Sequence, residues 1–399
     1  MEEEIVSNVL IFGFLIAVVM GFVGNRTHYC TMGAVSDWIS VGDTNRLRAW
    51  LFSIAVAVFG VSLLEFYQWI NLEVTRPPYR MSSLPWFRYI LGGIMFGVGM
   101  TLASGCGKKT LIRIGGGSLK SCFVFLVCGL SAYFMTQTVF YELIFHSWLS
   151  PITLNLSDYG FSGQSLGELI FGTDGIYGKN LILGAALAIL LGFWVFYSSE
   201  FRSRYGLILS SAVMGLGVTG GWYVTSGPIG RSWQESAEWM DQPPIGVGAQ
   251  SFTFISPMGE SLVYLQSGFN NLLLSFGVCA LIGIIVGSLS SALIFRTFHF
   301  EWFPSFKDFM NHMVGAVLMG VGGVLGMGCT IGQAVAGTST MSFGSIIVFL
   351  SIVFGSAVTV KTRYYLIYYD DEANLPKAIL SSLVDFRFLP KSFRRLDAV

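Results

Sequence analysis

The chain has 399 residues, of which 53% are hydrophobic and only 12% charged, and its formal net charge at pH 7 is zero. Average soluble domains carry roughly twice that charged fraction, so the composition excludes an ordinary soluble domain and predicts an all-α integral membrane protein in a lipid bilayer. The neutral charge and the lack of a basic tract argue against nucleic acid as a partner.

The N-terminus and the cysteines both fit a membrane protein without a secretory leader. Met1-Glu-Glu-Glu4 runs directly into an apolar segment and lacks the positive region of a cleavable signal peptide. All six cysteines fall in or beside apolar segments, and we expect them to be free thiols: they are Cys30, Cys106, Cys122, Cys128, Cys279 and Cys329.

Nine apolar segments are long enough to cross a bilayer, which takes about 20 residues. We expect the spans near residues 5–24, 48–70, 88–105, 118–143, 180–199, 206–224, 268–295, 312–328 and 343–360. An odd number of spans places the two ends of the chain on opposite sides of the membrane.

The distribution of Lys and Arg predicts the orientation. Five of the 23 fall on the side of the N-terminus and 18 on the other. Positive charge accumulates in cytoplasmic loops, so we expect the N-terminus outside and the C-terminus in the cytoplasm, as in a bacterial inner membrane. The long acidic loops 144–179 and 225–267 then lie outside, with Trp148, Trp233 and Trp239 suited to the interface. The tail after Lys361 is expected against the inner surface.

Two Gly-rich stretches, Gly97–Cys106 and Gly320–Cys329, share the same spacing between a Gly-x-Gly pair and a terminal Gly-Cys. A weaker match joins residues 17–24 and 211–217. Spans one to four therefore correspond to spans six to nine, and span five, as a connector, reverses the second half. This pattern predicts an inverted repeat with a transport site near the membrane midplane. The predicted divisions are 1–143, the loop and connector 144–205, 206–360, and the tail 361–399.

Both copies break at a cysteine, and a third break follows span one at Cys30. Irregular backbone at membrane depth lines a cavity or is buried in protein. A short helix after each cysteine directs free N–H groups at the site, which favours an anion, and a thiol is a small, polarisable, weak donor. Together these features favour a sulfur-containing anion. The remaining candidates for contact with it are Asn25, Arg26, His28, Lys108, Lys109, Thr110, Thr330 and Gln333. The break glycines are Gly24, Gly105, Gly107, Gly328 and Gly332.

Several of these features have simpler interpretations. Regularly spaced glycines are typical of close helix packing, and the other three cysteines are interpreted as packing residues. Lys108 and Lys109 lie either in the path or at the cytoplasmic surface, and the sequence leaves both placements open. His28 with Cys30 supplies too few ligands for a metal, so neither a metal nor another cofactor is expected.

No enzyme motif is present where it would matter, so we expect a transporter rather than an enzyme. Two alternatives stay open. A soft-metal carrier, for example for Cu(I), would use Cys and Met ligands. A non-transporting sulfur sensor or sulfur-transfer protein would need a reactive thiolate, which Lys108 beside Cys106 could favour.

At the three cysteine motifs the chain resembles the YeeE/YedE family of sulfur transporters, typified by bacterial thiosulfate uptake proteins. The resemblance rests on Gly24–Gly33, Gly97–Cys106 and Gly320–Gly332. It implies nine spans, short helices entering from both sides, and a central line of thiols that passes thiosulfate along by weak hydrogen bonds without a covalent step. A cytoplasmic sulfurtransferase is a possible partner. Two lysines after Cys106 depart from the family pattern, which leaves the identity of the anion open.

Overall fold

The computed structural model describes residues 2–172, 175–240, 243–370 and 373–397. The long helices in these ranges are α1 (Glu2–Arg26), α3 (Asn45–Phe66), α4 (Trp86–Leu102), α6 (Leu119–Gln137), α9 (Ile176–Phe196), α11 (Tyr205–Ser226), α14 (Phe276–Ile294), α15 (Phe306–Leu325) and α16 (Phe343–Tyr368). The shorter ones are α2 (Thr31–Ser40), α5 (Gly107–Gly115), α7 (Ser147–Leu149), α8 (Leu166–Phe171), α10 (Ser199–Ser203), α12 (Pro228–Glu238), α13 (Ile255–Gln266) and α17 (Leu375–Asp385).

The remaining regular structure is slight. Strand β1 (Thr75–Arg76) pairs in parallel with β4 (Ala249–Gln250), and β2 (Ser83–Leu84) pairs antiparallel with β3 (Leu154–Asn155). Turns of π-helix occur at η1 (Glu142–His146) and η4 (Gly332–Gly337), and 3₁₀ turns at η2 (Leu156–Tyr159), η3 (Asn271–Leu273) and η6 (Lys391–Phe393).

Nine helical segments in the described ranges are long and apolar enough to cross a membrane. The prediction of an all-α integral membrane protein with about nine spans is therefore confirmed. The largest boundary differences have local causes. The fourth span ends at Gln137 because Thr138 adopts an extended backbone. The seventh begins at Phe276 because Gly268 and Phe269 have positive φ angles and close the preceding helix.

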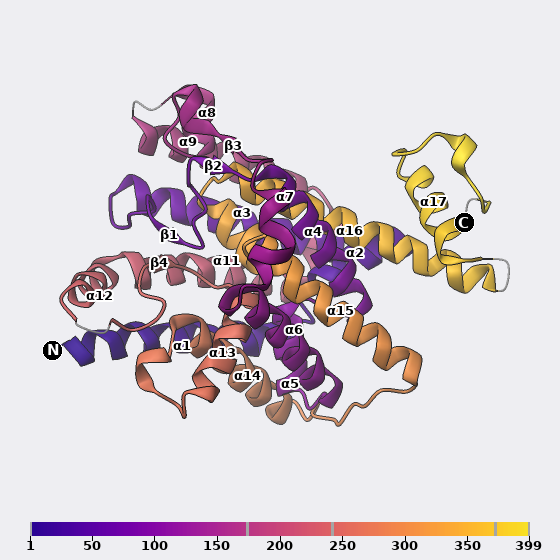
Figure 1. Cartoon of the computed structure of the whole chain (residues 1–399), viewed down its shortest axis with the longest axis horizontal. Coiled ribbons are helices and arrows are strands. Elements are labelled where there is room, and N and C mark those ends of the chain that lie inside the picture. Colours follow the sequence, from indigo (N-terminus) through magenta and orange to yellow (C-terminus); the bar gives the residue numbers. More distant parts are fainter. Residues whose placement is uncertain (1, 173–174, 241–242, 371–372, 398–399) are drawn as a thin grey trace.

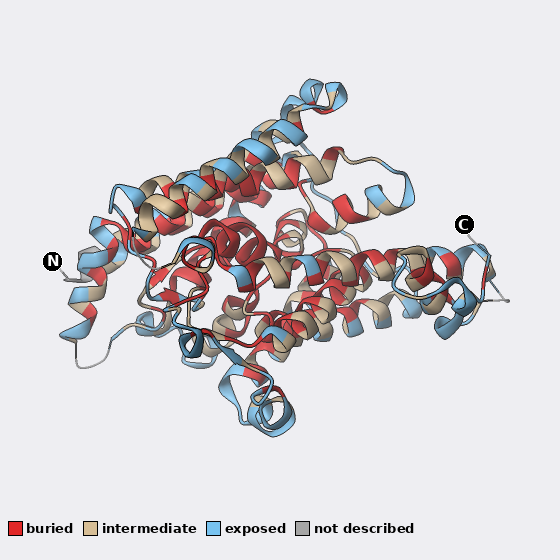
Figure 2. Cartoon of the chain, turned by 90° about the horizontal axis from the view of Figure 1, so that it is seen from above, coloured by how far each residue is buried: buried red, intermediate tan, exposed pale blue. Residues whose placement is uncertain are grey.

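The connector helix α9 has the surface expected of a lipid-facing segment. Ile189, Leu190 and Phe193 are about 70% exposed, and such a row of large apolar side chains is stable only against lipid or another protein. Figure 2 shows the complementary pattern, with buried residues gathered in the middle of the molecule and exposed ones on its outer helices and at its ends.

The packing of the spans is paired. Helix α1 packs on α14 while α11 packs on α3, and α16 packs on α4 while α6 packs on α15; the two Gly-rich helices α4 and α15 pack on each other (Figure 1). Each pair turns into its counterpart when spans one to four are exchanged with spans six to nine. We propose on this basis the division into repeats 1–143 and 206–360, with 144–205 as the connector and 361–399 as the tail.

The interpretation of 225–267 as a plain outer loop is incomplete. Phe252, Phe254 and Ile255 are fully buried, and the Ile255 side chain meets Gly107 and Gly323 at the ends of two other helices. The segment therefore runs into the molecule, and α13 leads back out against α6. Trp233 is 1% exposed, so it packs in the core instead of at the interface predicted for it.

The tail forms one further helix. Helix α17 packs against the end of α16, and Figure 1 shows both extending beyond the other helices. The Asp385 carboxylate binds the tail together, because it accepts a hydrogen bond from Tyr365 at 2.7 Å and lies 3.7 Å from the Lys361 ammonium.

Candidate functional site

The three predicted breaks share one backbone geometry. His28, Ser104 and Met327 have φ angles of 52°, 57° and 55°, and in each case a cysteine follows two residues later. Only glycine adopts this left-handed conformation without cost, so three ordinary residues are held there by their surroundings. Six other non-glycine residues in the described ranges also have a positive φ angle, several of them at helix ends, so the conformation marks a helix ending that recurs before each of the three cysteines.

The breaks in the two Gly-rich helices also close in the same way. The Gly105 amide donates to the Met100 carbonyl at 2.8 Å, and the Gly328 amide donates to the Gly323 carbonyl at 2.7 Å. Both bonds reach back five residues, as in a Schellman motif that ends a helix. The repeated sequence pattern thus produces a repeated helix ending, each delivering a cysteine to the start of a new helix.

The cysteines cap the short helices that follow the breaks. Cys30 precedes α2 and Cys106 precedes α5, and a helix through residues 330–339, containing η4, follows Cys329. The Cys30 sulfur accepts from the Gly33 amide at 3.4 Å and the Cys329 sulfur from the Gly332 amide at 3.5 Å. Three short helices therefore direct their N-termini at thiols, as predicted.

The Cys106 thiol lies near the other two thiols, because it interacts electrostatically with both Cys30 and Cys329. Cys106 and Cys329 are buried, whereas Cys30 is partly exposed. The amides of Ile331, Gly332 and Phe254 point at the Cys329 sulfur, and such clusters of N–H groups favour negative charge.

Lys108 lies in this central site. The side chain is 1% exposed, and its ammonium lies 3.9 Å from the centre of the Tyr29 ring and 3.6 Å from the Met214 sulfur. Among the described residues, no carboxylate forms an ion pair with Lys108. The ammonium is therefore a buried positive charge next to Cys106 and Cys30, with only an aromatic face and a thioether as neutral partners.

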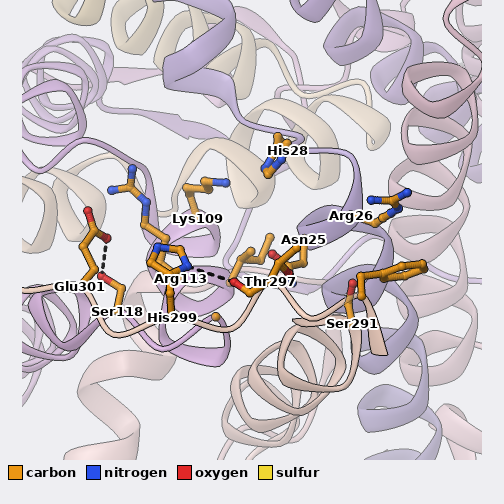
Figure 3. A pocket seen from close by; sticks show the side chains of 13 residues that line it. Asn25, Arg26, His28, Lys109, Arg113, Ser118, Ser291, Thr297, His299 and Glu301 are labelled. Carbon is orange, nitrogen blue, oxygen red and sulfur yellow. Dashed lines mark hydrogen bonds between the residues drawn. The ribbon is translucent and has the colours of Figure 1, made fainter. Parts of the chain in front are cut away.

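Lys109 faces a different space. It lines a cavity of about 300 Å³ with Asn25, Arg26 and His28 from the end of α1 (Figure 3). The Asn25 amide is fixed by a 3.0 Å hydrogen bond to the Ser288 carbonyl. Lys108 thus lies in the central site, whereas Lys109 lines a cavity at the end of the molecule where α1 finishes and also interacts electrostatically with Cys30 and Cys106.

Of the other predicted residues, one lies beside the thiols and two stabilise the short helices. The Thr330 hydroxyl faces the Cys106 thiol and makes no other hydrogen bond within the described ranges. Gln333 donates to the Gly326 carbonyl at 2.6 Å, which ties the short helix to the end of α15. Thr110 bonds to the Cys106 carbonyl at 3.2 Å within its own helix, so it stabilises the start of α5 and is not brought into the site.

The break glycines are required by close packing. A Cβ at Gly332 would lie 2.5 Å from the Thr253 hydroxyl, and one at Gly24 would lie 2.9 Å from the Ile112 side chain. At Gly105 and Gly107 the nearest atoms, from Lys109 and Ile255, would lie 3.0 Å away. Gly328 has a φ angle of 156°, which a side chain would strain.

Several site residues were missed by the sequence reasoning. Tyr79 donates to the Gly332 carbonyl at 2.7 Å, and Thr253 and Phe254 reach the Cys329 break from the segment before α13. The apolar run 252–255 inside a polar loop was the one available signal for that segment. Arg113 in the cavity wall follows Lys109 by one helical turn, a spacing that the sequence does contain.

Thr225 and the remaining three cysteines lie outside the three breaks. Thr225 bonds to the Gly221 carbonyl at 3.0 Å and also to the Gln250 backbone. That position supports β4, and no contact brings it to the thiols. Cys122 and Cys279 lie away from the breaks, in α6 and α14. Cys128 is buried in α6 within electrostatic range of Cys329.

Nine candidate spans in the described ranges, with helix ends at three cysteine motifs, define a multi-pass membrane protein. The sequence model of the family described as Sulphur transport matches residues 26–358, and the chain belongs to this family.

Two relatives are similar over nearly their whole length. The thiosulfate transporter TsuA of Spirochaeta thermophila is 24% identical over 354 residues, which cover 86% of this chain and 96% of the relative. The thiosulfate transporter TsuA of Escherichia coli is 23% identical over 384 residues, covering 90% and 95%. The resemblance to the YeeE/YedE family is thereby confirmed, and the protein is a multi-pass membrane protein of the sulphur transport family.

Proposed function

We propose that the protein takes up thiosulfate, or a closely related sulfur anion, across the cytoplasmic membrane, along Cys30, Cys106 and Cys329. The thiols act as weak S–H donors, and no covalent bond to the anion forms. The observation that carries the proposal is the unpaired Lys108 ammonium buried beside Cys106.

The energetics of Lys108 favour an anionic substrate. An isolated buried charge costs several kcal/mol, whereas a cation over an aromatic ring regains about 2 kcal/mol at most. The helix dipole adds to the cost, because Lys108 sits at the positive end of α5. A small anion at this point would offset the part of the burial cost of the ammonium that Tyr29 and Met214 leave uncompensated.

The thiols favour sulfur in that anion. A thiol donates a weak hydrogen bond and presents a polarisable surface, so a terminal sulfur atom is held loosely enough to leave again. Transport needs such weak sites in series, because a tight site would trap the anion. The neighbouring order Cys30, Cys106, Cys329 supports a series of this kind.

The charge distribution supports the orientation of the chain. The excess of Lys and Arg at the C-terminal side supports a cytoplasmic C-terminus. A cytoplasmic sulfurtransferase that consumes the anion would keep the flow inward. Within the described ranges, no three or more His, Cys, Asp or Glu side chains are grouped so that they could hold a metal ion; a Cu(I) carrier with Cys and Met ligands stays the alternative.

The test is uptake of labelled thiosulfate, sulfite and sulfate by proteoliposomes containing the full chain. We expect thiosulfate uptake by the wild type and its loss in Cys106→Ala and Cys329→Ala. Cys122→Ala and Cys279→Ala are matched controls, since they remove a thiol away from the breaks, and both should transport normally. Normal uptake by both break variants, or a persulfide trapped on Cys106 during turnover, would contradict the proposal.

A further inference from the structure

The cavity around Lys109 is strongly cationic. Arg26, Lys109 and Arg113 line it together with two histidines, His28 and His299 (Figure 3). Its one carboxylate, on Glu301, is already engaged, because the Lys120 ammonium lies 2.6 Å away and the Ser118 hydroxyl donates to it at 2.9 Å. The cavity wall therefore carries an excess of positive charge.

The three cations of the wall have few contacts with anionic groups: the Glu301 carboxylate acts electrostatically on Arg113, but without a close ion pair. Arg26 lies over the Phe295 ring at 4.3 Å, which is a contact with a neutral group. None of the three takes part in an ion pair among the described residues. Like charges gathered in one concave space repel each other, so an anion that enters the cavity is favoured.

Helix α5 connects this cavity with the central site. Lys109, Ile112, Arg113 and Gly116 line the cavity, and their spacing of three and four residues places them on one face of the helix and its end. Lys108 and the capping Cys106 at the start of the same helix belong to the central site. An anion that leaves the thiols meets Lys109 first and Arg113 one turn later.

We propose that this cavity is a second anion-binding site, in series with the thiol site, and that it takes small oxyanions without regard to a sulfur terminus. The inference extends the proposed function but rests on different residues. None of the cysteines lines the cavity, so its donors are N–H and O–H groups, which bind oxygen atoms. Sulfate and thiosulfate are equivalent ligands for such a site, whereas the thiols distinguish them.

The site is tested by binding of inorganic sulfate to the purified full-length protein, measured by titration calorimetry. The Lys108→Met variant removes the charge of the central site and should still bind one sulfate. In that background, Arg113→Gln should weaken sulfate binding at least about tenfold, the usual loss of a hydrogen bond to a charged group. Lys109→Gln should do the same and serves as the second variant if Arg113→Gln unfolds.

The matched control is Arg202→Gln in the same background. Arg202 lies on α10, outside the cavity, and donates to the Phe196 carbonyl at 2.8 Å. Sulfate binding should therefore persist in this variant. Thiosulfate should bind the Lys108→Met protein within about threefold of sulfate, and added salt should weaken both, because exposed charges are screened.

Two outcomes would overturn the second site: no sulfate binding by Lys108→Met, or binding unaffected by both cavity substitutions. The proposed function fails separately, by absence of thiosulfate uptake in wild-type proteoliposomes, a result that leaves sulfate binding in the cavity unaffected.

Discussion

The Lys108 ammonium lies 3.9 Å from the centre of the Tyr29 ring. Tyr29 is itself held in place, because its hydroxyl is hydrogen-bonded to the Ser53 hydroxyl at 2.7 Å. Since Tyr29 immediately precedes Cys30, this contact joins the first and second breaks. It holds a positive charge within electrostatic range of all three thiols, so charge and thiols form one site.

Lys108→Met should abolish transport without destabilising the fold. Methionine fills similar space but carries no charge, and replacing a buried, unpaired ion by an apolar group is neutral or stabilising. We expect an unchanged or higher melting temperature in detergent and thiosulfate uptake reduced more than tenfold. Lys179→Met is the control, because the Lys179 ammonium bonds to the Phe171 carbonyl at 2.8 Å near the start of α9. A Lys108→Met protein that melts early would show that the lysine is structural.

Thr330→Val should separate transport from stability at a second position. The Thr330 hydroxyl is buried and faces the Cys106 thiol, a weak hydrogen-bonding partner. Valine has nearly the same volume and removes this poorly satisfied polar group, so it should not lower the stability of the fold. Loss of one neutral hydrogen bond to the anion predicts uptake reduced by up to about tenfold, with the melting temperature unchanged or raised. Thr359→Val, whose hydroxyl bonds within its own helix at 2.7 Å, should leave uptake unchanged. Equal uptake in both variants would remove Thr330 from the path.

The spans and the helix breaks of this site can be predicted from the sequence, because each depends on a short run of consecutive residues. A long apolar run predicts a span wherever it occurs, and the matched Gly-Cys spacing predicts matched breaks at Cys106 and Cys329. The third break, at Cys30, is indicated by a different local signal, a polar stretch with a cysteine after span one. These features depend on a few consecutive residues and on the membrane, so tertiary packing does not alter them.

The rest of the site depends on long-range packing. Successive residues on a helix point about 100° apart, so the roles of Lys108 and Lys109 depend on how α5 is rotated against its neighbours. Phe254 reaches Cys329 from a segment predicted as an outer loop, and long-range contacts fix that course, among them the pairing of β4 with β1 and the bonds of Thr225 to Gln250. No local pattern encodes either arrangement.

A buried ion pair between Glu65 and Arg80 should be essential to folding. Their side chains are 2% and 8% exposed, the second guanidinium nitrogen lies 2.9 Å from the carboxylate, and the Arg80 Nε donates to the Thr340 carbonyl at 2.7 Å. Arg80→Met leaves a buried carboxylate alone, which costs about 3–5 kcal/mol. We expect a large drop in melting temperature, and a smaller one when Glu65→Leu is added. A double variant as unstable as Arg80→Met would show that the Thr340 contact matters more than the charge pair.

Gly97→Ala should destabilise the contact between α4 and α16. A Cβ at Gly97 would lie 2.2 Å from the Ile352 carbonyl oxygen and 2.8 Å from the Ser356 amide. These are backbone atoms that cannot move aside individually, so the helices must separate, at a cost of about 1–3 kcal/mol. Thermal unfolding in detergent should show a lower melting temperature.

The control for this prediction is Gly192→Ala in the lipid-facing helix α9. No atom lies within 4 Å of a Cβ built there, and alanine is intrinsically better than glycine in a helix by up to about 1 kcal/mol. The two substitutions should therefore shift the melting temperature in opposite directions. Because α4 ends just before Cys106 and packs on α15, which ends just before Cys329, the loss at Gly97 should also reduce thiosulfate uptake. A stable Gly97→Ala protein with normal uptake would refute the tight packing of these helices.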